Sequence, residues 1–340
     1  MRVTKDSLLR IAKETVQERA YNDPDIVAAY LTGSLRSEPM LGGTADIDIV
    51  FVHKTTPMKV REFVKLTPDF HIDISRRAKD EFKSPRELRG DPWLGYEMYD
   101  PVLLYEREKF FDFVQASLRA GFEFEQPPLM LQRCRTLLNH GRGNWMDISE
   151  HDGEVGPKEI RKYMKSLFHA VNAIAELSGP PIWERRLLLD FPVRAEAIQK
   201  PEMITTVYGL LGATQVDAEK IKTWLNDWKH AFKLASETPG VDARIHPARL
   251  NYYEKSIKAL LDGDTPLSAL WPVLHTWTLS AKVLSGDHLK FWEQACNSLG
   301  LLEGFADKVS GLDHFLDEIE IIFEEIATAN GLDVEPSTGL

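Results

Sequence analysis

One stretch of the sequence, Leu31–Val52, limits what this chain can fold into more than any other. It connects two short apolar runs rich in β-branched residues, and such runs are typical of buried strands. The pair Gly33-Ser34 directly follows the first run. Asp46 and Asp48 stand at the start of the second run. A fold that contains both strands therefore brings a glycine turn and two carboxylates near the strand ends.

The turn at Gly33-Ser34 has the chemistry of a phosphate-binding turn. A glycine lets the backbone approach an anion closely, and free N–H groups at the start of a helix favour negative charge. Ser34 adds a hydroxyl donor, and Arg36 lies two residues further on. Because arginine pairs well with phosphate oxygens, we predict Gly33, Ser34 and Arg36 as nucleotide-binding residues.

The aspartates form the second half of this predicted site. Asp46 and Asp48 are two residues apart, so a strand directs both carboxylates to one face. The alternating segment 69–75 is a further strand, and its Asp73 would lie near the pair if the two strands are adjacent. Clustered carboxylates beside phosphate oxygens are ligands of a hard divalent cation. We therefore expect Mg²⁺ or Mn²⁺ at Asp46, Asp48 and Asp73.

The ordered set of strand, Gly-Ser, spacer, Asp-x-Asp and third strand aspartate resembles the polymerase-beta-type nucleotidyltransferase superfamily over roughly residues 1–110. The resemblance implies transfer of a nucleoside monophosphate from an NTP, with ATP the first choice, to an acceptor hydroxyl with release of pyrophosphate. It also implies that Asp46, Asp48 and Asp73 are catalytic and bind the metal. The acceptor proton goes to Asp73 or to a glutamate of the C-terminal part, and both options stay open.

The pattern along the chain predicts an α+β fold. Helical spacing at 7–19 and strand patterns at 26–31 and 100–105 indicate an N-terminal nucleotidyltransferase core with a small mixed β-sheet. Prolines in the segment Phe122–Pro128 mark a boundary, followed by a larger all-helical domain. The predicted domains are 1–121 and 126–330. This layout is similar to that of aminoglycoside nucleotidyltransferases, with the active site in the cleft between the domains.

Two predictions concern the walls of that cleft in the C-terminal domain. Four glycines between Asn139 and Gly156 predict a loop that borders the cleft. The helix predicted to begin at Pro157 carries a largely basic ridge at steps of four and three: Lys158, Lys162, Lys165, His169 and Asn172. Facing the cleft, this ridge would contact nucleotide phosphates, and on that basis Lys165 is predicted to bind the nucleotide. Facing outward, it would be an ordinary solvated face.

Composition limits the partners and the location. The chain has 340 residues, a net charge of −11 and two distant cysteines. An acidic chain lacks the broad basic surface typical of nucleic-acid binding, so we expect an NTP and a small-molecule acceptor, aminoglycoside-like as one option, as partners. No run of 18 apolar residues and no signal-peptide pattern occurs, which predicts no membrane span and a cytoplasmic location.

Two other functions remain open at this point. One is a non-catalytic, antitoxin-like binding protein that keeps the fold; the retained carboxylates Asp46, Asp48 and Asp73 argue against it. The other is an enzyme that modifies a protein or RNA end, and the absence of a basic stripe makes RNA the weaker option. The sequence does not decide which NTP or acceptor binds, or the oligomeric state.

Overall fold

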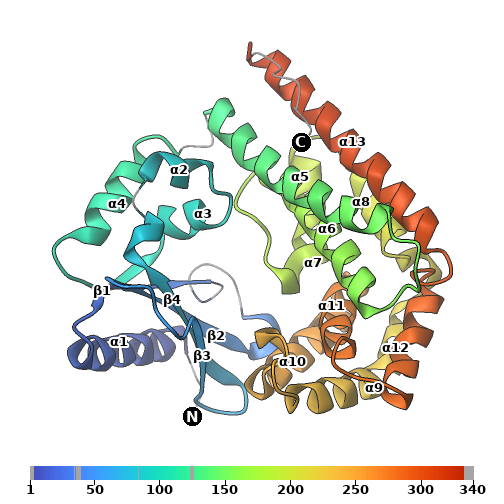
Figure 1. Ribbon diagram of the computed structural model, residues 1–340, viewed down its shortest axis with the longest axis horizontal. Coiled ribbons are helices and arrows are strands. Elements are labelled where there is room, and N and C mark those ends of the chain that lie inside the picture. The colour runs from blue at the N-terminus through green and yellow to red at the C-terminus, as the bar shows by residue number, and fades with distance from the viewer. Residues whose placement is uncertain (1–3, 34, 36–39, 83, 123–125, 333–340) are drawn as a thin grey trace.

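A five-stranded mixed sheet organises the N-terminal part of the chain, in the order β3-β4-β2-β1-β5. A computed structural model describes residues 4–33, 35, 40–82, 84–122 and 126–332. The strands are β1 (Ile26–Thr32), β2 (Ala45–His53), β3 (Arg61–Lys65), β4 (Phe70–Ala78) and β5 (Val102–Glu106) (Figure 1). β2 and β4 are parallel, whereas β1 is antiparallel to β2 and β5, and β3 is antiparallel to β4.

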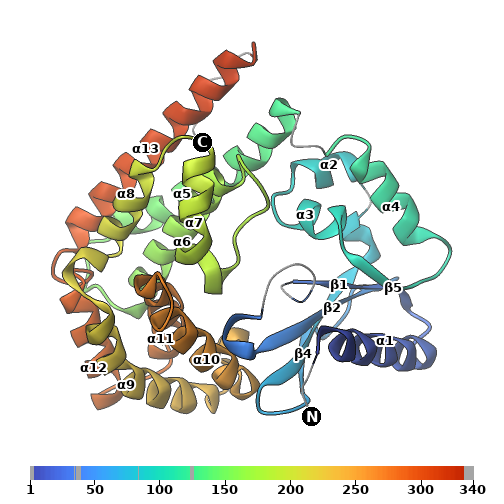
Figure 2. The same cartoon turned by 180° about the vertical axis from the view of Figure 1, so that it is seen from behind.

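Helices cover both faces of this sheet. On one face lies α1 (Lys5–Asn22), and on the other lie α2 (Pro85–Gly90), α3 (Leu94–Tyr99) and α4 (Phe110–Arg119) (Figures 1 and 2). Every residue of β1 is buried, because strands covered on both faces carry apolar side chains in both directions. Each face has its own hydrophobic core, one shared with α1 and one shared with α2 to α4.

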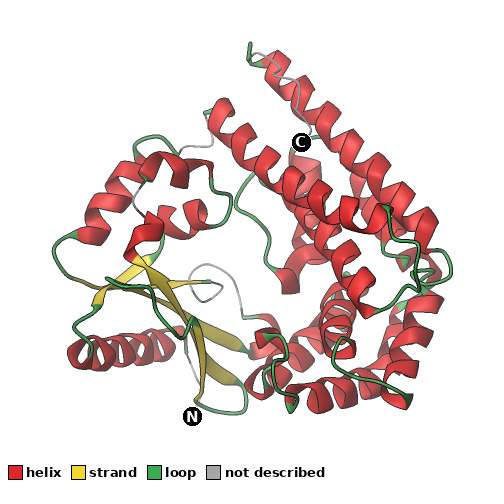
Figure 3. Cartoon of the chain, in the orientation of Figure 1, coloured by secondary structure: helices red, strands yellow, loops and turns green. Residues whose placement is uncertain are grey.

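All the regular structure after residue 126 is helical in the described part of the chain (Figure 3). The helices are α5 (Pro127–Ser149), α6 (Pro157–Ala175), α7 (Leu187–Ala197), α8 (Glu202–Leu210), α9 (Ala218–Ser236), α10 (Leu250–Leu261), α11 (Leu270–Ala281), α12 (Asp287–Ser298) and α13 (Phe305–Ala329). Their apolar faces form a third core, the largest, which runs from Met130 to Ala327. The predicted α+β class, a small mixed sheet followed by a larger helical part, is confirmed.

The helical part touches the sheet part at separate places. Lys255 of α10 forms an ion pair with Asp69, with a nitrogen–oxygen distance of 2.7 Å. Trp93, from the segment between α2 and α3, stacks on Phe168 of α6 with 5.7 Å between ring centroids. Asp69 directly precedes β4 and Trp93 lies between α2 and α3, so the helical part is in contact with two places of the sheet part and both parts can contribute to one site.

The prediction of a loop at 139–156 is wrong for residues 139–149, because α5 continues to Ser149. Gly141 lies inside this helix for a packing reason. A Cβ there would approach the Leu316 side chain and the Ser166 carbonyl, both at 3.3 Å. The Ser166 hydroxyl also donates to the Gly141 carbonyl at 2.7 Å. The glycine therefore lets α5 pack closely on α6 and α13 and does not mark a turn.

Among the described strands and α-helices, the sequence analysis also missed five: β3, α3, α7, α8 and α12. The proposed boundary between 1–121 and 126–330 falls beside residues 123–125, which lie outside the described residues, and it stays a prediction. None of the helices in the described part of the chain combines the length and the apolar composition that crossing a bilayer requires.

Candidate active site

The three aspartates predicted from sequence meet at the end of the sheet. Asp46 and Asp48 come from β2, and Asp73 lies directly opposite Asp48 on the parallel strand β4. One carboxylate oxygen from each lies within 4.8 Å of the others. Asp46 and Asp73 are 3% and 2% exposed, so these groups are held in place. We call Asp46, Asp48 and Asp73 the carboxylate cluster.

Two arginines neutralise part of this cluster. Arg61 of β3 binds Asp73 with two parallel hydrogen bonds, Nε to Oδ1 at 2.9 Å and Nη2 to Oδ2 at 2.5 Å. Arg249 lies between two aspartates, 3.3 Å from Asp46 Oδ2 and 3.8 Å from Asp73 Oδ2. No described residue donates a hydrogen bond to the carboxylate of Asp48. The three carboxylates therefore have unequal surroundings.

The different surroundings shift the pKa values of Asp46 and Asp48 in opposite directions. Burial raises the pKa of Asp48 well above its usual value, and the nearby charges of Asp46 and Asp73 raise it further. Burial also acts on Asp46, but the guanidinium groups of Arg249 and Arg185 outweigh it and lower the pKa. Like charges held together without a counter-ion disfavour ionisation. Asp48 is thus the carboxylate of the cluster that forms no hydrogen bond or ion pair with a cation among the described residues, although Arg249 and Arg61 lie near enough to oppose part of the rise in its pKa.

Gly33 lies beside Asp48, and its missing side chain makes room for that aspartate. Its backbone is in the left-handed region, at φ 75°, and a Cβ would overlap the Asp48 carboxylate oxygen. Gly33 also lines the cavity described below, as a phosphate-binding turn would require. Ser34 and Arg36, predicted in the same turn, lie outside the described residues.

A cavity of about 450 Å³ opens in front of the carboxylate cluster, between the sheet and the helical part. Its charged lining is mainly basic, although the chain has a net charge of −11. The carboxylates are those of Asp46, Asp48, Glu97 and Glu184, and the cations are those of Arg61, Arg77, Arg161, Lys165, Arg185, Arg186, Arg244 and Arg249. This composition suits a ligand that carries several negative charges.

The helical side of the cavity supplies most of the positive charge. We call Arg161, Lys165, Arg185, Arg244 and Arg249 the basic wall; they come from α6 and from the short 3-10 helices Glu184–Arg186, Ala243–Ile245 and Pro247–Arg249. Arg185 is only 7% exposed, stacks over the ring of Tyr252 at 3.5 Å, and its Nη1 has no partner among the described residues. A buried N–H donor without a partner is costly, and an anionic ligand would remove that cost.

The structure divides the predicted basic ridge of α6. Lys165 lines the cavity, and so does His169, whose pKa burial lowers to about 4. Lys158 is exposed, and Lys162 pairs with Asp147 at 2.9 Å. Asn172 is buried and its side-chain oxygen accepts a bond from the Ile182 backbone. Only Lys165 and His169 of the ridge therefore face the cavity, where Arg161 and Phe168 join them.

Sequence reasoning missed Arg61, Arg185, Arg249 and Glu184. The strand that carries Arg61 could have been found, because Arg61, Phe63 and Lys65 alternate with Glu62 and Val64. Arg185 and Arg249 lie in short 3-10 segments, which have no periodic pattern to detect. Glu184 lies 3.4 Å from Arg244 and 3.7 Å from His275. It is the helical-part glutamate at the cavity.

The donor set of the carboxylate cluster fits a divalent cation. Three carboxylates offer the hard oxygen ligands that Mg²⁺ and Mn²⁺ prefer, and their oxygens converge within 4.8 Å. In this structure the oxygens of Asp73 are engaged by Arg61. A cation at this cluster would therefore have to share or replace those contacts.

Comparisons with known proteins add little to this geometry. No family model matches the chain, and no curated protein matches it either. Among solved structures it is similar to a nucleotidyltransferase-like protein from Exiguobacterium sibiricum 255-15, with 10% identity over 88% of this chain and 89% of that one. The TM-score is 0.28, too low to support an argument.

Proposed function

We propose that this protein is a metal-dependent nucleotidyltransferase. It moves a nucleoside monophosphate from an NTP, with ATP as the first candidate, to a hydroxyl of a small-molecule acceptor and releases pyrophosphate. One observation carries the proposal: Asp46 and Asp48 line a cavity that the basic wall also lines, and Asp73 converges with them in the carboxylate cluster. An acidic cluster facing a basic wall is the arrangement that a metal–triphosphate complex needs.

In this proposal the carboxylate cluster holds Mg²⁺ or Mn²⁺ through its three aspartates. When bound, the cation neutralises charge on the transferring phosphoryl group and activates the attacking hydroxyl. The chain itself holds the carboxylates in fixed positions. The parallel pairing of β2 and β4 places Asp48 opposite Asp73, and the burial of Asp46 and Asp73 restricts their movement. Fixed ligands of this kind lower the reorganisation needed during the reaction.

The triphosphate would lie between Gly33 and the basic wall. Gly33 lets the backbone approach a phosphate, and Ser34 and Arg36 belong to the same proposed turn. On the opposite side, Lys165 and Arg185 line the cavity without a carboxylate partner among the described residues. Guanidinium and ammonium groups bind phosphate oxygens strongly where water is excluded. These residues are therefore the proposed nucleotide ligands.

Two carboxylates are candidates for accepting the proton of the acceptor hydroxyl. Asp73 is held by Arg61 and Arg249, so both of its oxygens already accept bonds. Glu184 lines the cavity opposite the sheet and is part of the helical side. Burial acts to raise the pKa of Glu184, but the positive charges around it, which at neutral pH include those of Arg244 and Arg161, lower it, so Glu184 is ionised at neutral pH. Glu184→Gln and Asp73→Asn pH profiles would distinguish the two.

The charge of the cavity also bears on the acceptor. Among the described residues, its lining contains eight cationic and four acidic side chains. A polycationic acceptor such as an aminoglycoside would be repelled by this excess, whereas a neutral or anionic acceptor would not. The panel of acceptors to be tested should therefore include neutral and anionic hydroxyl compounds beside aminoglycosides.

A transfer assay tests the proposed function. The protein is incubated with Mg²⁺, NTPs labelled at the α-phosphate, the acceptor panel and a metabolite extract, and labelled product and pyrophosphate are followed. We expect wild type to transfer label and Asp48→Asn to be slower by at least about a hundredfold, because metal-held carboxylates contribute several kcal/mol. Equal rates in both proteins would show that the site is misassigned. Absence of NTP binding would favour a non-catalytic binding protein.

A further inference from the structure

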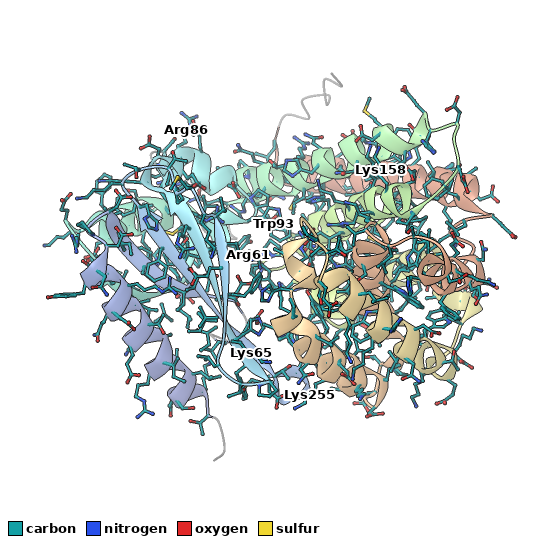
Figure 4. All side chains as sticks on the ribbon, turned by 60° about the horizontal axis from the view of Figure 1, so that its bottom comes forward. Arg61, Lys65, Arg86, Trp93, Lys158 and Lys255 are labelled. Atoms are coloured by element: carbon teal, nitrogen blue, oxygen red, sulfur yellow. The ribbon has the colours of Figure 1, made fainter. Side chains whose placement is uncertain are left out.

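Arg61 is in an unusual position for a residue beside a metal site. It belongs to β3, the edge strand of the sheet, and its side chain is 36% exposed. It nevertheless engages both oxygens of Asp73, whose side chain is only 2% exposed. Figure 4 places Arg61 and Trp93 at the boundary between the sheet part and the helical part.

The Arg61 contact and a metal at Asp73 compete for the same atoms. A divalent cation binds carboxylate oxygens at about 2.0–2.1 Å, and the Arg61 nitrogens already lie 2.9 and 2.5 Å from those oxygens. Both partners are positively charged, so they repel one another when they share a carboxylate. A cation can bind well here only if Arg61 has another anion to move to.

Arg249, the other arginine at the cluster, is held differently. Its contacts are longer, at 3.3 and 3.8 Å, and its side chain is 9% exposed. It lies over the rings of Phe63, Tyr252 and Tyr253, with 5.7, 5.3 and 5.4 Å to their centroids. Arg249 is therefore fixed by its burial among three rings, whereas Arg61, which lies over the Phe63 ring at 5.2 Å but has a side chain 36% exposed, has room to reorient.

We propose that Arg61 is a positioning residue that makes the metal and the triphosphate bind as a pair. Without nucleotide, Arg61 holds Asp73 and weakens metal binding. When the metal–triphosphate complex enters, the guanidinium group moves from Asp73 to a phosphate oxygen, a partner that arginine binds equally well. The inference rests on the proposed function, because it needs a metal and a triphosphate in this cavity.

This role predicts effects of opposite sign when Arg61 is removed. Metal binding to the nucleotide-free protein becomes tighter, because a competing positive charge is gone. Nucleotide binding in the presence of metal becomes weaker, because a phosphate ligand is gone. Metal then increases the affinity for nucleotide less than in wild type. Nucleotide increases the affinity for metal less by the same factor, since such coupling is reciprocal. A purely structural arginine would weaken both ligands together.

The test measures binding and not activity. Mn²⁺ binding to the nucleotide-free protein is followed by electron paramagnetic resonance for wild type, Arg61→Ala and Arg61→Lys. The matched control is Lys65→Ala, which removes one positive charge from the exposed end of the same strand (Figure 4). We expect Mn²⁺ to bind Arg61→Ala about tenfold more tightly than wild type, since a like charge at a few ångströms is removed, and Lys65→Ala to match wild type.

The second measurement is binding of α,β-methylene ATP with saturating Mg²⁺, for which Arg61→Ala should be about tenfold weaker, as for a lost charged hydrogen bond. Arg61→Lys keeps the charge and should change both affinities less. If thermal melting shows that Arg61→Ala does not fold, Arg61→Lys is the variant in which both affinities are measured. Unchanged or weaker Mn²⁺ binding, or unchanged nucleotide binding, overturns the inference alone. If wild type binds no Mn²⁺ even with nucleotide, the proposed function fails as well.

Discussion

The two sides of the cavity differ in how they are built. The sheet side places its acids through strand register, with Gly33, Asp46 and Asp73 on three neighbouring strands or their ends. The cations of the basic wall lie on one helix and three short 3-10 segments, and they are spread along the chain from residue 161 to residue 249. Local sequence specifies the first side, whereas the second exists only once the helical core has formed.

The two sides are alike in one physical respect. Burial and the neighbouring acids raise the pKa of Asp48, while burial and the neighbouring Arg244 lower the pKa of Arg161. Each side therefore holds buried like charges at a cost to stability. A cation would relieve that cost on the sheet side, and a triphosphate would relieve it on the basic wall. The comparison indicates that each side prepares the cavity for one part of the same ligand.

The largest effect on nucleotide binding is expected at the basic wall. Arg185→Met keeps the length of the stem over Tyr252 and removes the buried charge, so affinity for α,β-methylene ATP with Mg²⁺ should fall by about tenfold to a hundredfold. Lys165→Ala, at the exposed rim, should lose less. Fluorescence or calorimetric titration gives both values.

Lys158→Ala is the matched control for Lys165→Ala, because Lys158 lies on the same helix but outside the cavity lining. Figure 4 places Lys158 away from the Arg61–Trp93 boundary. Its affinity should equal that of wild type. If Arg185→Met also binds the nucleotide as wild type does, the basic wall does not contact the triphosphate. The two sides of the cavity would then not bind two parts of the same ligand.

An intermediate effect is expected at Gly33. Gly33 and Gly43 both have positive φ, at 75° and 67°, but only a Cβ at Gly33 would meet Asp48; none of the atoms in the described structure lies within 4 Å of one at Gly43. Left-handed backbone costs about 1–2 kcal/mol for a residue with a Cβ, and both Gly→Ala variants share that cost.

Only Gly33→Ala should in addition weaken Mn²⁺ binding, because it displaces a carboxylate of the cluster. Thermal melting and Mn²⁺ titration of the two variants separate the shared backbone cost from the loss at the site. Equal Mn²⁺ affinity in Gly33→Ala and Gly43→Ala would mean that Gly33 does not position Asp48.

The smallest expected effect is that of Asp48→Asn on the stability of the metal-free protein, and Asp73→Asn is the variant to compare it with. Asp73→Asn weakens the charged bonds to Arg61 and Arg249 and should cost about 1–3 kcal/mol. Asp48→Asn removes a carboxylate without a described donor and should be neutral or stabilising. Because folding raises the pKa of Asp48, its carboxylate destabilises the fold as pH rises above about 4. The advantage of Asp48→Asn should therefore grow from pH 4 to pH 7.

Melting curves in EDTA at several pH values check this pair of opposite effects. If both variants shift the melting temperature in the same direction at pH 7, the unequal pairing of the carboxylates is not what sets their stability.

The sequence predicted the acidic side of the site and little of the basic side. Asp46, Asp48 and Asp73 could be predicted because the two-residue strand period and strand adjacency are local rules. Lys165 was predicted from a ridge, but the rotation of α6 is fixed by tertiary packing, and the face at the cavity combines Lys165 with Arg161 and Phe168. Rotation of a helix depends on all its neighbours, which no local pattern specifies.

Other parts of the fold escaped prediction for related reasons. Gly141 looked like a loop residue, yet it lies inside α5 because close helix packing needs a small side chain there. Arg185 and Arg249 reach the cavity from 3-10 segments far apart in the chain, and only the assembled core brings them beside Asp46. Long-range placement of single side chains is the information that the sequence pattern lacks.

The central claim is that the carboxylate cluster and the basic wall form one site for a metal–triphosphate complex. Calorimetric titration of the wild-type protein with α,β-methylene ATP, in Mg²⁺ and in EDTA, tests it most directly. The claim predicts binding at least about tenfold tighter with Mg²⁺, because the cation screens the triphosphate from the three carboxylates. Equal affinity in Mg²⁺ and EDTA would contradict it.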